Sequence, residues 1–183
     1  HGGDGFHTNT LEIIEKGNER HFKPFRQGYI LISLRNLHAV AIIDPDRQKV
    51  TWALSGLWTH QHQPEILSNG NILIFDNMGE KGRSKVIEFE PATQEIVWSY
   101  RGSGENEFAT EDLGTQQRLP NGNTLITESR DGRVFEVTPE NEIVWEFVNP
   151  RRTGENGEMI ATIFDMVRLQ PENLPFLGQK IEE

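Results

Sequence analysis

Cysteine is absent from the sequence. This absence excludes disulfides, a thiol nucleophile and any metal site built on cysteine, and it leaves the redox compartment of the protein open. Long apolar runs are also missing, since none approaches the roughly 18 residues that a membrane-spanning helix needs. The chain opens directly with HGGDGFHTNT and shows no secretory signal, which is compatible with a mature or trimmed N-terminus.

Positive charge is scarce. The chain has 18 Lys and Arg against 28 Asp and Glu, a net charge of −10. This balance argues against nucleic acid or an anionic membrane surface as the main partner. It leaves room for a small anionic substrate, because a local group of Arg and His side chains can bind one. At 183 residues, the chain has the length of one domain rather than two.

The sequence contains an internal repeat. The segment that starts LSNGNILIFDN at Leu67 aligns with LPNGNTLITES at Leu119, 52 positions later, and a weaker copy starts at Arg26. Trp52, Trp98 and Trp145 each end an apolar stretch, at intervals of 46 and 47 residues. A period of about 40–50 residues that contains several short strands is typical of β-propeller blades.

Each copy divides into four strands. In the second copy we expect strands at 62–67, 72–75, 86–89 and 96–98, with an Asn-Gly-Asn turn after the first. The sequence thus predicts an all-β fold of four-stranded antiparallel blades, roughly 6–56, 57–102 and 113–150, and a terminal segment, 151–183. The tryptophans and the turns have a structural role in this interpretation. Residues 158–169 are compatible with either a helix or a strand.

Three blades do not close a ring, because propellers typically have four to eight. Left in an open row, they would expose sheet faces and edges. The chain is therefore either part of a longer propeller or is completed by a second copy or a partner chain. We favour the first interpretation, with 151–183 as a terminal wrap and a solvated tail.

Functional candidates are the positions at which the blades differ. Seven residues after the turn glycines Gly28, Gly70 and Gly122 stand Arg35, Asn77 and Ser129 in turn. Arg35 has no counterpart in the other blades, and it is either a functional residue or an ordinary surface arginine. His7 and His62 stand at the heads of first strands, which line the channel of a propeller. Loop ends on a rigid ring are a common place for function, so these three side chains could meet in one pocket.

At these residues the sequence resembles the bacterial arylsulfotransferases (the ASST family) that use no nucleotide sulfate donor. The similarity lies in three motifs in the family's order: DGFHTN at 4–9, ISLRNLHAVAIID at 32–44 and WTHQHQPEILSNGNILIFDN at 58–77. The resemblance implies a six-bladed propeller, a periplasmic location, no cofactor, and aryl sulfates and phenols as small-molecule partners. No segment matches a further histidine that the family carries on an earlier blade, so activity is expected to need the rest of the ring.

The resemblance also implies roles for individual residues. His62 would take the sulfuryl group as the nucleophile, and Arg35 would bind the sulfuryl oxygens. His7 would bind sulfate oxygens or the phenolic oxygen, with Asn9 and His60 as supporting residues. A neutral imidazole suits this chemistry near pH 7, and a planar guanidinium suits a tetrahedral oxyanion.

Other interpretations remain open at this point. His60 and His62, two apart on a strand, would share a face and could bind a metal with Asp76, although no clear further ligand is present. A non-catalytic propeller that serves as a binding or assembly scaffold is the main alternative. A quinone-dependent dehydrogenase would share the blade tryptophans, but no cofactor-binding pattern is visible. His21 and His38 are expected to be solvated loop residues.

Overall fold

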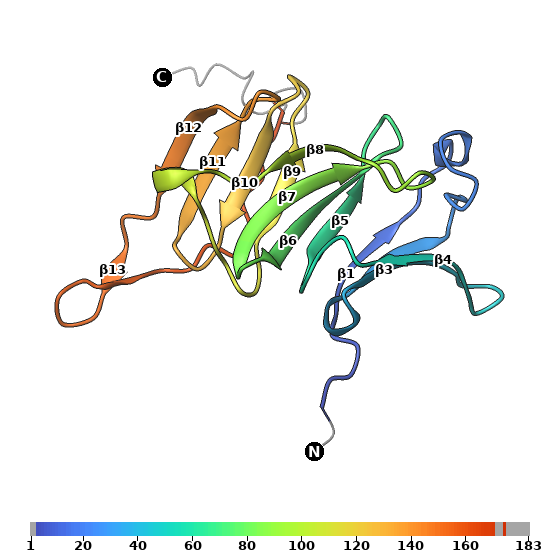
Figure 1. Cartoon of the computed structure of the whole chain (residues 1–183), viewed down its shortest axis with the longest axis horizontal. Helices are drawn as coiled ribbons and strands as arrows, with labels where there is room; N and C mark the ends of the chain where they lie inside the picture. The colour runs from blue at the N-terminus through green and yellow to red at the C-terminus, as the bar shows by residue number, and fades with distance from the viewer. Residues whose placement is uncertain (1–2, 171–173, 175–183) are drawn as a thin grey trace, which may run out of the picture.

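The computed structural model describes residues 3–170 and 174, and within them the chain folds into three four-stranded antiparallel sheets (Figure 1). In each sheet the strands follow one another in sequence order. Blade 1 holds β1 (Thr8–Ile13), β2 (Ile30–Leu34), β3 (Ala39–Asp44) and β4 (Lys49–Ser55). Blade 2 holds β5 (His62–Ile66), β6 (Ile72–Glu80), β7 (Arg83–Phe89) and β8 (Ile96–Tyr100). Blade 3 holds β9 (Thr115–Arg118), β10 (Thr124–Glu128), β11 (Arg133–Val137) and β12 (Ile143–Val148).

The predicted fold class is therefore confirmed, as far as blades of four antiparallel strands are concerned. The three sheets do not close a ring, and membership of a six-bladed ring stays a prediction. Short 3-10 turns occur at Asn18–Arg20, Arg35–Leu37 and Gly104–Asn106. Among the described residues, no helix has the length and apolar character needed to cross a membrane.

The Asn-Gly-Asn turns join the first two strands of blades 2 and 3. In blade 2, the N–H of Asn71 donates to the side chain of Asn69 at 3.0 Å, and the side chain of Asn71 donates to Glu88 at 2.6 Å. Gly70 has φ +89°, and a Cβ atom there would lie 2.3 Å from Cβ of His21. The turn thus needs glycine for both its backbone conformation and its close packing. His21 packs on this turn, so the expectation that it is merely solvated is wrong.

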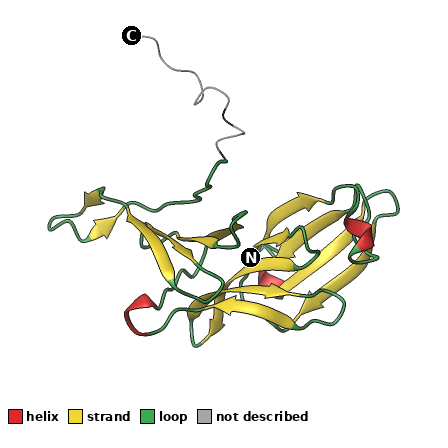
Figure 2. Cartoon of the chain, turned by 90° about the horizontal axis from the view of Figure 1, so that it is seen from above, coloured by secondary structure: helices red, strands yellow, loops and turns green. Residues whose placement is uncertain are grey.

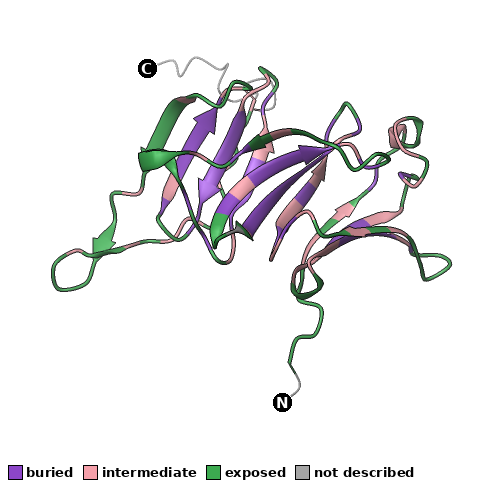
Figure 3. Ribbon diagram, viewed as in Figure 1, coloured by how far each residue is buried: buried purple, intermediate pink, exposed green. Residues whose placement is uncertain are grey.

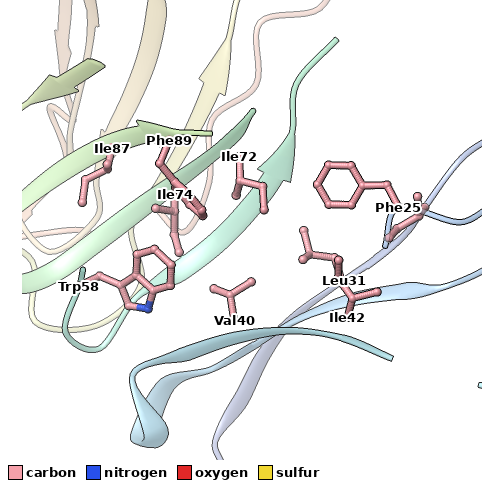
Figure 4. Close-up of a cluster of buried hydrophobic side chains, with 10 residues drawn as sticks. Phe25, Leu31, Val40, Ile42, Trp58, Ile72, Ile74, Ile87 and Phe89 are labelled. Atoms are coloured by element: carbon pink, nitrogen blue, oxygen red, sulfur yellow. The ribbon is translucent and has the colours of Figure 1, made fainter. Parts of the chain in front are cut away.

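The hydrophobic core lies between the blades rather than inside one sheet. Figure 4 shows side chains of blade 1, among them Leu31, Val40 and Ile42, facing Ile72 and Ile74 of blade 2. A second cluster joins blades 2 and 3 and includes the fully buried Phe75 and Phe135. Burying a side chain of this size contributes about 1.5–3 kcal/mol. The blades are therefore held side by side by apolar packing, and each leaves a face for its neighbour.

The first and fourth strands of each blade are more exposed than the two strands between them. The middle strands are buried, whereas β12 is exposed along nearly all of its length (Figure 3). The first strands contact each other across blades: the N–H of Gln63 on β5 donates to the hydroxyl of Thr10 on β1 at 3.0 Å. Since β1, β5 and β9 are the strands that meet at the blade junctions, their heads lie close together.

The segment after blade 3 begins with a two-stranded hairpin, β13 (Arg152–Thr153) and β14 (Met159–Ile160), which projects from the blades (Figure 2). The helical interpretation of 158–169 is wrong, since residues 161–170 form no regular element. Ile163 and Met166 instead pack against Leu119 and its neighbours in blade 3, and this apolar contact decides the conformation. The predicted solvated tail lies almost wholly outside the described residues.

Candidate functional site

His62 is the first residue of β5 and is half-buried. Its Nδ1 atom lies 2.7 Å from Oδ1 of Asn77 on β6 and 3.2 Å from the backbone oxygen of His60. Both neighbouring atoms are acceptors, provided that the amide of Asn77 is oriented with its oxygen toward the imidazole. The orientation of that amide therefore decides which nitrogen of His62 carries the proton.

Asn77 is held in one orientation by the backbone of blade 3. Its Nδ2 group donates to the backbone oxygens of Thr110, at 2.8 Å, and Leu113, at 2.7 Å. Asn77 is completely buried, so no solvent competes for these bonds. With the amide nitrogen committed to two carbonyls, Oδ1 is the atom that faces His62. Nδ1 of His62 therefore carries the proton, and Nε2 keeps the free lone pair of a nucleophile.

Arg35 follows β2 and starts the turn Arg35–Leu37. Its backbone N–H donates to the backbone oxygen of His7 at 3.1 Å. Its Nη1 group donates to the side-chain oxygen of Asn36 at 3.2 Å, and its Nη2 group lies 3.4 Å from the backbone oxygen of Glu111, in the loop between β8 and β9. Its Nε atom is buried without a hydrogen-bond partner in the described chain. Within the described residues no carboxylate forms an ion pair with Arg35. A buried, unsatisfied donor on an unpaired cation is suited to bind an anion.

Burial and positive neighbours lower the pKa of His62 below its usual value. Burial is the largest cause, and the positive charges of Arg35 and His7 lower the pKa further, while the hydrogen bond with Asn77 opposes them. The imidazole is thus neutral at pH 7, as a nucleophile must be. Because Arg35 and His7 both act on it, the structure brings the three residues into one electrostatic neighbourhood.

His60 belongs to the same neighbourhood. Burial, Arg35 and His38 lower the pKa of His60, in that order of size. Its backbone N–H donates to Nδ1 of His38 at 3.1 Å, and the two rings lie 4.9 Å apart. His38 is therefore a half-buried partner of His60, and the expectation that it is a solvated loop residue is wrong.

The backbone around these histidines is unusual. His7, His38 and His60 have positive φ values of 46°, 51° and 58°, as does Gln63 next to His62, with 47°. Residues with side chains rarely adopt this left-handed conformation, and such residues cluster at functional sites. The tertiary structure holds three of the six histidines in this conformation around one arginine.

The other two predicted residues, His7 and Asn9, lie on or next to β1. His7 is exposed, and its Nδ1 atom lies 2.9 Å from a carboxylate oxygen of Asp4. Asn9 donates its side-chain N–H to the backbone oxygen of Gln61 at 2.8 Å, which ties β1 to the segment before β5. Asn9 thus positions the loop that carries His60 and His62. A direct contact of Asn9 with a substrate stays a prediction.

Sequence reasoning missed two residues of the site. Asn77 fixes the His62 tautomer, and Asp112 lies near both His62 and Arg35, whose charges lower its pKa in addition to the larger effect of Arg130. Two hydrogen bonds of 2.7 Å join Asp112 to Arg130. A signal for Asn77 was present, since it stands at the position of Arg35 in its own blade. No pattern in the sequence pointed to Asp112.

The metal interpretation gains no support from the geometry. His60 precedes β5 and its ring lies against that of His38, whereas His62 points to Asn77, so the two do not share a strand face. Among the described residues, no group of three or more His, Asp or Glu side chains is placed to hold a metal ion. A hollow of about 270 Å³ elsewhere, lined by Lys81, Arg83 and their neighbours, does not include the histidine cluster.

Comparison with known families decides the ancestry of this arrangement. The sequence model of the family described as Arylsulfotransferase (ASST) matches residues 3–150, well over half of the chain. The chain belongs to the ASST family. The match includes His7, Arg35 and His62. No curated protein matches the sequence.

Solved structures show the same fold for this ASST chain. A protein of unknown function from Bacteroides caccae aligns with a TM-score of 0.52 at 18% identity, over 80% of this chain and 47% of its own. The WD40 β-propeller domain of Doa1 aligns with a TM-score of 0.55 at 14% identity, over 78% and 41%. At such identities the likeness concerns the fold alone. The chain spans less than half the length of either structure.

Proposed function

We propose that this ASST chain supplies part of the active site of an arylsulfotransferase, which moves a sulfuryl group from an aryl sulfate to a phenol. The observation that carries the proposal is the Asn77–His62 hydrogen bond of 2.7 Å, together with Arg35, whose charge acts on His62 and whose Nε has no hydrogen-bond partner in the described chain. It combines a neutral imidazole of defined tautomer with a free cation. Family membership supports the substrate class but leaves the mechanism open to test.

The reaction would proceed in two displacements. In the first, Nε2 of His62 attacks the sulfur of the aryl sulfate, an N–S bond forms, the S–O bond to the ring breaks, and a phenolate leaves. In the second, the oxygen of an acceptor phenol attacks the same sulfur, an S–O bond forms, the N–S bond breaks to release His62, and the phenolic proton passes to the departed phenolate or to solvent. Nδ1–H stays bonded to Asn77 throughout, which stabilises the positive charge on the imidazole.

Arg35 would stabilise the charge that develops on the sulfuryl oxygens. Its Nε–H has no partner in the described chain, and the hydrogen bonds of its Nη groups to Asn36 and Glu111 fix the guanidinium before the substrate arrives, so little reorganisation is needed in the transition state. His7 and His60 would contact sulfate or phenolic oxygen. The remaining wall of the channel would come from blades outside this chain.

The test uses 4-nitrophenyl sulfate as donor and phenol as acceptor, with the chain alone and with the complete ring. We expect nitrophenol release that His62→Asn abolishes, and a mass increase of one sulfuryl group located on His62 after donor treatment. His21→Gln, far from the cluster, is the matched control and should keep activity. A complete ring that releases no nitrophenol and acquires no sulfuryl group would favour the non-catalytic scaffold instead.

A further inference from the structure

Side chains on the first strand of each blade accept hydrogen bonds from the backbone of the next first strand. Glu12 on β1 accepts the N–H of Ile66 on β5 at 3.3 Å. Burial raises the pKa of Glu65 on β5, and the backbone N–H and the charge of the neighbouring Arg118 on β9 oppose this effect. The next contact of the series leads outside the blades, because Gln117 on β9 accepts the N–H of Arg168 at 2.8 Å.

The residues that donate these bonds also fill equivalent places against the preceding blade. Arg118 pairs with Glu88 at 2.8 Å, and its guanidinium lies 5.0 Å from the ring of Trp98. Arg168 repeats this arrangement, since it pairs with Glu136 and lies 5.1 Å from the ring of Trp145. Residues 163–168 therefore occupy the place of the first strand of a fourth blade.

The junction of blades 1 and 2 uses a different chemistry at the same place. Ile66 and Trp52 both pack against the cluster that contains Ile42, and Ile42 pairs with Trp52 across β3 and β4, as Glu88 pairs with Trp98 across β7 and β8. Two matched combinations of residues therefore occur at the blade junctions, each beside a tryptophan. Between blades 1 and 2 an aliphatic residue packs near an aliphatic residue, and between blades 2 and 3 an arginine pairs with a glutamate.

Blade 1 carries one half of such a junction on its open side. Ile13 occupies in blade 1 the position that Ile66 occupies in blade 2. In each blade the N–H of the next residue donates to the residue just before the second strand, at 2.8 Å from Ile14 to Tyr29 and at 2.9 Å from Leu67 to Asn71. Ile13 is 63% exposed and Leu11 is 61% exposed. Isolated exposed apolar residues are ordinary, but these two lie on a strand whose counterparts are covered by a neighbouring blade.

We propose that the open face of β1, with Leu11 and Ile13, binds a propeller blade that offers an aliphatic residue and a tryptophan in the places of Ile42 and Trp52. By the same repeat, that blade also offers an acceptor to the backbone N–H of Ile13. A second copy of this chain does not fit. Its blade 3 offers Glu136, which would face Ile13 without an arginine to pair with, and residues 163–168 already cover that face.

We call the matching of arginine with glutamate, and of aliphatic with aliphatic residues, at the blade junctions the pairing rule. It is tested first within the intact chain. We replace Arg168→Met and Glu136→Gln, singly and together, and measure hydrogen exchange of the Ile163 amide, which bonds to the backbone oxygen of Ser129 at 3.1 Å. Glutamine keeps the acceptor for Asn123, and methionine keeps the stem that packs on Trp145. We expect Arg168→Met to speed exchange by about tenfold or more, and by far less once Glu136 is neutral. Additive effects would refute the pairing rule.

The partner chemistry is tested by self-association of full-length chains measured by sedimentation velocity. Ile163→Asp with Met166→Asp undocks the terminal segment and frees blade 3. In this background the chain should stay monomeric with Ile13 unchanged and with the control Ile13→Gln. Two separate variants of this background should form dimers. In Ile13→Arg the new arginine can pair with Glu136 of the second copy, and in Glu136→Leu the new leucine can pack against Ile13.

The outcomes separate the possible occupants of the β1 face. Dimers that form equally well with Ile13 and Glu136 both unchanged would identify a second copy as the partner and overturn the proposal. Monomers in both matched variants, with cooperative unfolding intact, would show that these residues do not govern docking. If the undocked background fails to fold, the exchange cycle at Arg168 and Glu136 still tests the residue pairing on which the proposal rests, and additive effects there would overturn it.

Discussion

The hydrogen bond between Asn77 and His62 makes a prediction that does not depend on catalysis. Replacing Asn77→Asp places one carboxylate oxygen 2.7 Å from Nδ1 of a half-buried imidazole. The other oxygen faces the carbonyls of Thr110 and Leu113, so the substitution also lowers folding stability. A neighbouring opposite charge at this range typically shifts a pKa by about 1–3 units, or about 1.4–4 kcal/mol. The pKa of His62, below 6.5 in the native chain, should therefore rise toward or above neutrality.

The opposite change gives the opposite shift. The bond from Asn77 raises the pKa of His62 and so counteracts part of the effect of burial. Asn77→Ala removes the bond and should lower the pKa further. It also leaves the carbonyls of Thr110 and Leu113 without their donor, which costs about 1–3 kcal/mol of folding stability for each. The two substitutions at one buried position thus move the same titration in opposite directions.

Nitrogen-15 NMR of histidine-labelled protein measures both the tautomer and the pKa of His62. We expect a neutral imidazole with the proton on Nδ1 at pH 7 in the native chain, and an imidazolium in Asn77→Asp. His21, which packs on the turn at Gly70, serves as an internal reference. A native His62 that carries its proton on Nε2, or that titrates above 6.5, would refute the assignment of the nucleophilic nitrogen.

Further predictions concern stability. Burial raises the pKa of Glu12 to about 7 from 4.5, so the folded chain holds a proton that the unfolded chain releases, and stability falls as the pH rises from about 4.5 to 7. Glu12→Gln should remove this loss and raise the free energy of unfolding, measured by thermal denaturation, by about 1–2 kcal/mol at pH 8 after solvent screening, with almost no gain at pH 4. An equal gain at the two pH values would contradict the prediction. Gly114→Ala should cost about 2–4 kcal/mol in urea unfolding, because φ is +86° and the new Cβ would lie 2.6 Å from the ring of Phe75. Gly122→Ala, with φ +90° but only Pro139 at 3.6 Å, should cost about 1–2 kcal/mol, and equal losses at the two glycines would contradict the steric argument.

Much of the architecture was predictable because repeats and strand patterns are visible in short stretches of the sequence. The 52-residue offset between Leu67 and Leu119 and the spacing of Trp52, Trp98 and Trp145 record a repeated unit of four short strands. The strands formed close to the expected residues, although β6 runs on to Glu80. The conformation of 158–169 was not predictable, because its apolar residues fit both the helical and the strand periodicity. The packing of Ile163 and Met166 against blade 3 is a tertiary contact that the local pattern does not record.

The site divides in the same way. The sequence by itself determined the blade repeat and marked His7, Arg35 and His62 as departures from it, because residue identity and spacing are local properties. Only the tertiary structure decided that Asn77 holds the imidazole of His62, that His38 contacts His60 and that Asp112 lies nearby. These contacts join segments far apart in the chain, and the fixed orientation of Asn77 comes from backbone carbonyls, which carry no residue-specific signal.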